Sequence, residues 1–333
     1  MAFVLPSGLY PEAPPLRTHA MAVSHGHVLH VEESGDPAGI CALVLHGGPG
    51  SGSSPLLRRF FDPARYRVIS VDQRGAGRSR PRGATAHNST GELLQDLRIV
   101  RERLDVQRWL VAGGSWGATL ALAYAGFEPS AVSALLLRSV FLPTAAEIEA
   151  FFQDAGGCEP AAWARFAAVA PPDRRPGMLR FLADGLRQAP IPANANLQRR
   201  LALAWWRWER TMASGAAVPS TDPDPSTDAQ DALVDRYRVQ SHYLVHRCWL
   251  DEPPLLERLG ALPQVPTLLL HSRDDRVCRP QAAQAVHDRL AHARLRWVDG
   301  AGHDPAHPAM ASAMVAALDS HALHGHFEDG PAR

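Results

Sequence analysis

The stretch Gly113-Gly114-Ser115-Trp116-Gly117, with the segments on either side of it, decides the fold of this 333-residue chain. Ahead of it lies the apolar run Leu110-Val111-Ala112, which is typical of a buried strand, and behind it lies Ala118–Tyr124, a run of good helix formers. A Gly-x-Ser-x-Gly motif between a strand and a helix is the context of a nucleophile elbow. The turn needs glycines because a Cβ on either side would collide with neighbouring backbone. The stretch therefore predicts that the Ser115 hydroxyl is exposed at a strand end, and a glycine-rich loop without chemistry is the plainer alternative.

Composition is that of an ordinary globular protein. Hydrophobic residues make up 46% and charged residues 20%, and the formal net charge is zero, which favours neither a nucleic-acid nor an anionic membrane partner. The 34 basic residues are all arginine, so no lysine nucleophile or Schiff base is available. The four widely spaced cysteines are expected to be reduced thiols. With no signal-peptide pattern and no apolar run near the ~20 residues that span a bilayer, we expect a cytoplasmic monomer or small homo-oligomer.

Strand-like and helical segments alternate on both sides of the elbow. Buried-strand runs occur at Cys41–Leu45, Arg67–Val71 and Ala134–Leu137, and strands resume at Pro266–Leu270 and Arg294–Val298. This alternation predicts a mostly parallel α/β sheet with helices on both faces. The intervening chain has a helical pattern without strand-like runs. We therefore expect a catalytic domain of residues 1–142 and 261–333 and an inserted helical cap of residues 143–260.

Histidines near the N-terminus are the nearest approach to a metal-binding pattern. His25, His27 and His30 are closely spaced, but no cysteine or carboxylate completes a set of ligands. Their alternation is better explained by a hairpin of two short strands, His19–Ser24 and His27–Glu33. We expect no metal site and no cofactor.

A serine nucleophile requires a base that takes its proton and an acid that orients the base. In proteins with a nucleophile elbow the acid follows a late strand and the histidine follows the last one. Here the late strand leads to Asp274 and Asp275, and the last strand leads to Asp299-Gly300-Ala301-Gly302-His303. Spacing predicts His303 as the base but does not choose between the two aspartates.

An oxyanion hole is expected from two backbone N–H groups. One belongs to Trp116, directly after the nucleophile, and the other to the Gly47-Gly48 loop that follows the first buried strand. Ser115 would attack a carbonyl while these groups stabilise the charge that develops on its oxygen.

These motifs resemble the prolyl aminopeptidases, also called proline iminopeptidases. The resemblance is carried by His46-Gly47-Gly48-Pro49-Gly50, by Asp72-Gln73-Arg74-Gly75-Ala76-Gly77-Arg78-Ser79, by the elbow, and by Arg138 with Phe141, and it extends over nearly the whole chain. That family consists of α/β-hydrolases that remove an N-terminal proline from peptides without a metal. The resemblance implies Gly48 as the second oxyanion donor. It also implies Asp275 as the acid, because the family's late loop, His-Gly-Arg-Tyr-Asp-x-x-Cys, aligns on His271–Cys278 and places Asp274 where the family has tyrosine.

The resemblance also implies acidic cap residues that bind the substrate's free amine. One of them matches Glu209 in the segment Trp205–Glu209. The second family glutamate precedes Asn-His-Tyr, and Gln240 stands at that place here. Glutamine accepts a hydrogen bond but carries no charge, so the field that holds a cationic amine is weaker. Phe141 and Trp208 are either walls of an apolar pocket for a pyrrolidine ring or part of the cap core.

Together these residues predict a serine-dependent aminopeptidase that releases an N-terminal proline or other small residue through a Ser115-His303-Asp275 triad and an acyl-enzyme. Its partner would be a small peptide with a free N-terminus. The alternative is an esterase or amidase of the same fold without amine specificity, which the glutamine at position 240 favours. A more remote alternative, from another class, is a binding protein without catalysis, which the intact triad argues against.

Overall fold

One sheet forms the centre of the molecule. The computed structural model describes residues 8–153, 157–188, 191–214 and 223–328. Within them, eight strands form one sheet in the order β1-β2-β4-β3-β5-β6-β7-β8. Their bounds are β1 Arg17–Ala22, β2 Val28–Gly35, β3 Ile40–Leu45, β4 Tyr66–Asp72, β5 Trp109–Gly114, β6 Val132–Arg138, β7 Thr267–His271 and β8 Ala293–Trp297. β1 and β2 form an antiparallel hairpin, β2 pairs antiparallel with β4, and all other pairs are parallel. The predicted mostly parallel sheet is confirmed.

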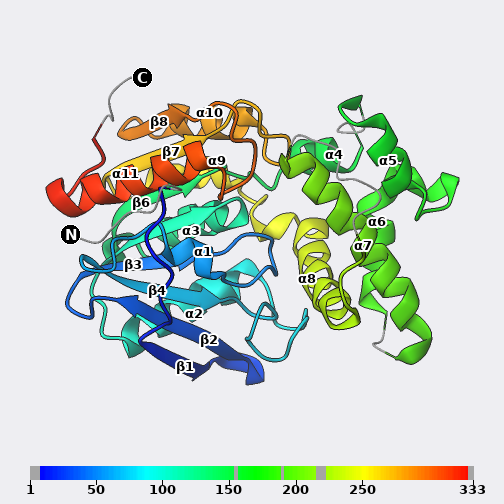
Figure 1. The fold of residues 1–333 in the computed structure, drawn as a ribbon, viewed down its shortest axis with the longest axis horizontal. Helices are drawn as coiled ribbons and strands as arrows, with labels where there is room; N and C mark the ends of the chain where they lie inside the picture. Colours follow the sequence, from blue (N-terminus) through cyan, green and yellow to red (C-terminus); the bar gives the residue numbers. More distant parts are fainter. Residues whose placement is uncertain (1–7, 154–156, 189–190, 215–222, 329–333) are drawn as a thin grey trace.

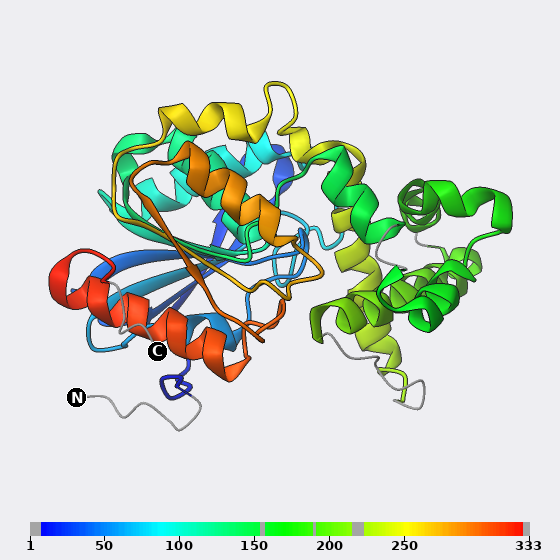
Figure 2. The same cartoon turned by 90° about the horizontal axis from the view of Figure 1, so that it is seen from above.

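Helices cover both faces of this sheet (Figures 1 and 2). One face carries α2 (Thr90–Arg103), α3 (Trp116–Phe127) and α10 (Pro280–Arg289). The other carries α1 (Pro55–Arg58) and α11 (Pro308–His324). In β3, Leu43 and Leu45 belong to the core on the first face, and Ala42 and Val44 to the core on the second. Because both faces of the central strands are buried, their sequences are continuous apolar runs.

A buried ion pair anchors the polar turn after β4 to the helix layer. The Arg74 guanidinium donates to both carboxylate oxygens of Asp96 on α2, with Nε–Oδ2 at 2.6 Å and Nη2–Oδ1 at 2.8 Å. Neither side chain is more than 2% exposed. Two parallel N–H···O bonds fix direction as well as distance. The turn is therefore held in one orientation at the carboxyl edge of the sheet.

A group of five helices lies to one side of the sheet (Figure 1). They are α4 Ala145–Phe152, α5 Pro160–Ala167, α6 Met178–Arg187, α7 Pro192–Ser214 and α8 Thr227–Val245. We refer to them as the cap. Their core is aromatic: the Trp205 ring lies 5.1 Å from the Phe152 ring and 4.7 Å from the Tyr237 ring, centroid to centroid. These large rings belong to the same continuous apolar cluster as the core on the first face of the sheet, so the cap and the sheet layer are packed together.

The short helical segments between α8 and β7 bear on where the cap ends. The remaining helical segments are α9 Leu255–Arg258 and the 3-10 turns η1 Ser24–Gly26, η2 Pro129–Ala131, η4 Pro172–Gly177, η5 Arg247–Trp249 and η6 Leu259–Ala261. Of these, η5 contacts α2 as well as the cap helix α8, α9 contacts α10, and η6 contacts α3 and α10. We therefore propose a cap of residues 143–246, shorter than the expected 143–260.

Within the described ranges, no helix combines the length and the apolarity that crossing a membrane requires.

Candidate active site

Ser115 occupies a strained position between β5 and α3. Its backbone has φ 56° and ψ −124°, in a region that costs a non-glycine residue about 1–3 kcal/mol. A Cβ on Gly113 would lie 2.3 Å from the Gly117 carbonyl oxygen, and one on Gly117 would lie 2.2 Å from the Leu45 carbonyl oxygen. Both distances are far below any real Cβ contact. The sharp turn is possible because glycine stands at both positions, and it presents the Ser115 side chain at the carboxyl edge of the sheet.

A histidine and a buried aspartate meet in the loops that follow β7 and β8. The His303 Nδ1 lies 2.8 Å from the Asp275 Oδ2, and the Asp275 Oδ1 accepts the backbone N–H groups of Val277 (2.9 Å) and Cys278 (2.8 Å). Burial by itself raises the pKa of Asp275, but His303 and the N–H donors more than offset it and lower the pKa to about 2. Asp275 is therefore an ionised acceptor that favours the His303 tautomer with its proton on Nδ1.

The structure distinguishes the two adjacent aspartates. Asp274 is exposed, and its Oδ2 accepts the backbone N–H of Gly300 at 2.8 Å. Asp275 is 3% exposed and is the one whose carboxylate reaches His303. The spacing of the sequence did not distinguish Asp274 from Asp275. The two differ because the loop after β7 directs the Asp275 side chain into the protein, toward His303, and the Asp274 side chain toward solvent.

Ser115 and His303 open into the same cavity. This cavity has a volume of about 350 Å³ and lies between the carboxyl edge of the sheet and the cap helices α4, α7 and α8. The Ser115 Oγ lies 3.6 Å from the Sγ of Cys278. In the described part of the chain no hydrogen bond joins the Ser115 Oγ to His303. Such bonds are often long in unliganded sites and tighten when substrate binds.

Two loops that would supply the oxyanion donors are joined by Gln73. The backbone N–H of Trp116 is in the first turn of α3, where N–H groups have no partner within the helix, and Gly48 lines the cavity. The Gln73 Oε1 accepts from the Trp116 indole at 2.8 Å, and its Nε2 donates to the His46 carbonyl at 3.1 Å. Gln73 therefore fixes the elbow and the glycine loop relative to each other. Gln73 lies within one of the motifs that carry the family resemblance, but nothing in the sequence indicated that it joins these two loops.

Arg138 stabilises the loop that carries His303. It lies at the end of β6, and its Nη1 donates to the His303 carbonyl at 2.9 Å and to the Ser139 hydroxyl at 3.0 Å. Burial lowers the pKa of Arg138, while the negative charge of Asp275 raises it. A buried cation beside Asp275 stabilises the ionised carboxylate. Sequence reasoning listed Arg138 only as a mark of resemblance.

Three polar cap residues that line the cavity contact one another. Glu209 comes from α7, and Arg236 and Gln240 come from α8. The Arg236 Nη2 donates to the Glu209 Oε1 in an ion pair, and the Gln240 Nε2 donates to the Glu209 Oε2 at 3.4 Å. The structure thus brings together the two positions expected to bind an amine. It adds an arginine that the sequence reasoning missed, although the i, i+4 spacing from Gln240 places both on one helix face.

The two aromatic candidates have different surroundings. Phe141 lines the cavity together with Phe151 and Phe152. Trp208 does not line it, because its indole is buried behind Phe151 and donates to the Phe151 carbonyl at 3.1 Å. Phe141 therefore fits the pocket-wall interpretation, and Trp208 fits the cap-core interpretation.

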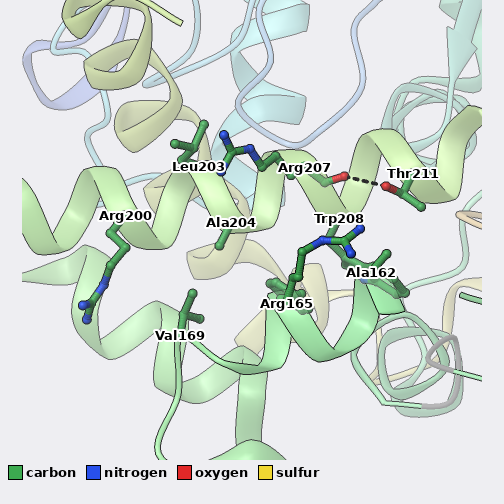
Figure 3. A pocket seen from close by; sticks show the side chains of 10 residues that line it. Ala162, Arg165, Val169, Arg200, Leu203, Ala204, Arg207, Trp208 and Thr211 are labelled. Atoms are coloured by element: carbon green, nitrogen blue, oxygen red, sulfur yellow. Dashed lines mark hydrogen bonds between the residues drawn. The ribbon is translucent and has the colours of Figure 1, made fainter. Parts of the chain in front are cut away.

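Trp208 also borders a second, smaller cavity of about 230 Å³ between α5 and α7. The Phe166 ring is stacked on the Trp208 ring with centroids 5.7 Å apart. Arg165, Arg200 and Arg207 line this cavity, but Figure 3 shows their side chains extending in different directions. The three guanidinium groups do not converge on one point, so this cavity lacks the geometry of an anion site.

One cluster in the described residues contains three potential metal ligands. His25, His87 and Glu92 lie with their ligand atoms within 4.8 Å of one another, and both histidines are exposed. The two imidazole rings are stacked 3.9 Å apart with an interplanar angle of 4°. Parallel rings direct their nitrogen lone pairs along parallel planes, whereas metal coordination needs lone pairs that converge. The cluster is therefore a pair of stacked imidazole rings beside Glu92, which belongs to the capping box at the N-terminus of α2.

Comparison with known proteins identifies the class of protein to which this chain belongs. The family described as having the alpha/beta hydrolase fold matches residues 43–307. A crystal structure of a proline iminopeptidase-related protein from Thermus thermophilus matches with a TM-score of 0.55 at 22% identity, covering 92% of this chain and 97% of that one. The chain belongs to the α/β-hydrolase family.

Relatives with similar sequences show to which group of α/β-hydrolases the chain belongs. The proline iminopeptidase of Xylella fastidiosa (strain 9a5c) is 36% identical over 314 residues, covering 94% of this chain and 98% of the relative. The proline iminopeptidase of Arabidopsis thaliana is 34% identical over 317 residues, covering 95% and 82%. Within the α/β-hydrolases, this chain is a member of the proline iminopeptidase family, and the resemblance inferred from its motifs is confirmed.

Proposed function

We propose that this protein is a serine-dependent aminopeptidase that releases an N-terminal proline, or another small residue, from short peptides. The observation that carries the proposal is the 2.8 Å contact between the His303 Nδ1 and the buried Asp275, in a cavity that also contains the elbow serine. The names of the relatives support proline as the residue released.

This geometry supports a mechanism with an acyl-enzyme intermediate. Ser115 attacks the carbonyl carbon of the first peptide bond while His303 takes its proton and then passes it to the leaving amine. Asp275 holds the imidazole tautomer and stabilises the imidazolium. The N–H groups of Trp116 and Gly48 stabilise the negative charge on the carbonyl oxygen. Water, activated by His303, then hydrolyses the acyl-enzyme.

The cap limits what can enter. Phe141, Ile148 and Phe151 give the cavity apolar walls suited to a small ring, and Glu209 with Gln240 lies at the end where the substrate's amine would be. A substrate whose first residue is small can place its carbonyl at Ser115 while its amine reaches Glu209. A small peptide with a free N-terminus is the partner that fits these contacts.

An esterase or amidase without amine specificity is the second candidate. The observation that favours it is the ion pair between Arg236 and Glu209, because this pair partly neutralises the carboxylate that would attract an amine. Gln240 adds no charge to replace it.

Replacing Ser115 by alanine tests the proposal. With purified protein and a chromogenic prolyl amide, we expect turnover to fall by about 10⁴-fold or more, because the nucleophile is lost. Circular dichroism should show an unchanged fold. Full activity in this variant would refute the nucleophile assignment. Equal rates of the wild-type enzyme on free and N-acylated prolyl amides would favour the second candidate.

A further inference from the structure

The charged side chains that line the cavity balance one another. Among the described residues that line it, the carboxylates are Glu147 and Glu209 and the guanidinium groups are Arg138 and Arg236. Glu147 also pairs with Arg279, with Nη2–Oε1 at 2.7 Å. A site that attracts a cation by charge needs an excess of negative charge. This lining does not provide one.

Arg236 pairs with the carboxylate that is expected to bind the substrate amine. Its guanidinium and the Glu209 carboxylate are 24% and 20% exposed, so the pair is largely shielded from water. Gln240 donates to the second carboxylate oxygen, so each oxygen of Glu209 already has one donor. Burial lowers the pKa of Arg236, but the charge of Glu209 outweighs it and the pKa is raised. The guanidinium stays charged, and a substrate ammonium must compete with it for Glu209.

Two of the side chains that line the cavity, Arg236 and Gln240, carry buried polar atoms that are unsatisfied. The Gln240 Oε1 and the Arg236 Nε have no hydrogen-bond partner within the part of the chain that the structure describes. Gln240 is 8% exposed. Buried polar atoms without partners are costly, and that cost is recovered when these side chains turn toward a ligand in the cavity and pair with it. One is an acceptor and the other a donor, and their residues flank the same carboxylate. A group that offers one N–H and one C=O without a charge complements them.

We propose that Arg236 determines the specificity of this site: it takes the place of the substrate ammonium on Glu209 and, with Gln240, selects an uncharged acyl group that carries an N–H and a C=O. The five-membered lactam of an N-terminal 5-oxoproline residue has this chemistry and the ring size of proline. Its ring N–H would donate to the Gln240 Oε1, and its ring carbonyl would accept from Arg236.

The inference rests on the proposed function and changes only the acyl group. Ser115 forms an ester with the 5-oxoprolyl carbonyl, the peptide amine leaves with the proton from His303, and water releases 5-oxoproline. No co-reactant beyond water is needed.

Chromogenic anilides of 5-oxoproline and proline provide the test, because the two rings differ mainly in charge and in the carbonyl. For the wild-type enzyme we expect kcat/KM for the 5-oxoprolyl anilide to lie within tenfold of that for the prolyl anilide, or above it. In Arg236→Met, the freed Glu209 should raise prolyl kcat/KM about tenfold or more through a charge-assisted bond. Loss of the donor should lower 5-oxoprolyl kcat/KM about tenfold.

Further variants separate a specificity role from a structural one. Arg236→Lys keeps the positive charge beside Glu209 and should keep the wild-type ratio of the two rates. Gln240→Glu leaves Arg236 in place and should shift the ratio at least tenfold toward the prolyl anilide, so the proposal stays testable even when Arg236→Met does not fold. Arg199→Met is the matched control, because it removes a guanidinium of the cap that pairs with Asp231 and does not line the cavity. It should leave both rates unchanged.

Two results would overturn the inference. The first is a wild-type enzyme that cleaves the prolyl anilide and rejects the 5-oxoprolyl anilide by more than 100-fold. The second is a ratio that neither Arg236→Met nor Gln240→Glu moves. In both cases the aminopeptidase assignment would stand. Cleavage of a simple acyl ester with no cleavage of either anilide would instead refute the proposed function on which the inference rests.

Discussion

Replacing Asp275 by asparagine changes one atom of the proposed triad and predicts a specific defect. The Asp275 Oδ1 accepts two backbone N–H groups, from Val277 and Cys278, and asparagine can keep both only by placing its carbonyl oxygen there. Its NH₂ group then faces the His303 Nδ1, which must become an acceptor. The proton moves to Nε2, so the nitrogen that should take the Ser115 proton already carries one.

The expected loss is large because the base is held in the wrong tautomer. The equivalent change in a serine protease triad lowers kcat about 10⁴-fold, which corresponds to about 5 kcal/mol of activation free energy. The assay is the steady-state release of a chromogenic amine from a prolyl amide, with the concentration of folded protein checked by circular dichroism.

Asp274→Asn is the matched control for this variant. Asp274 is exposed and accepts from Gly300 rather than from His303, so we expect its replacement to change kcat less than tenfold. The reasoning fails when Asp275→Asn stays within tenfold of the wild type, or when the Asp274 variant loses as much activity as the Asp275 variant.

Three further predictions concern stability. Gly117→Ala places a Cβ 2.2 Å from the Leu45 carbonyl oxygen, so we expect a loss of about 1–3 kcal/mol or more in urea unfolding together with lost turnover; an unchanged urea midpoint would contradict the packing argument. Asp96→Ala leaves the buried Arg74 unpaired and should cost about 3–5 kcal/mol; a loss below about 1 kcal/mol, in the same measurement, would show that the pair matters little. The pKa of Asp275 is lowered from 3.8 to about 2, so its ionised form stabilises the fold by about 2 kcal/mol above pH 4. This stabilisation is lost as the pH falls toward 2, and the urea midpoints of the wild type and Asp275→Asn should converge over that range. Urea midpoints that stay equally far apart at all these pH values would argue against the lowered pKa.

The fold could be predicted because its signals are local. Continuous apolar runs such as Cys41–Leu45 indicate strands buried on both faces, and the predicted and observed strands differ by at most two residues at each end. The elbow is equally local, since the clash that requires Gly117 involves backbone only. Steric limits and hydrophobic periodicity act over a few residues, so they can be read without knowing the tertiary contacts.

Contacts between distant segments could not be predicted in this way. The ion pair between Arg236 and Glu209 joins residues 27 positions apart on two cap helices. The Gln73 amide joins the elbow and the glycine loop, and its bond to the Trp116 indole spans 43 positions. Such contacts depend on how helices and loops pack, and no periodicity in the sequence records them.

By itself, the sequence determined the mostly parallel sheet and the position of Ser115 on its elbow, because glycine placement and apolar runs limit the backbone directly. The family was indicated by the resemblance of its motifs. The tertiary structure decided that Asp275 rather than Asp274 faces His303, that Phe141 but not Trp208 lines the cavity, and that Arg236 shares the carboxylate of Glu209. Each of these depends on the direction in which a side chain points once separate elements pack together, and neighbouring residues with similar chemistry differ only in that direction.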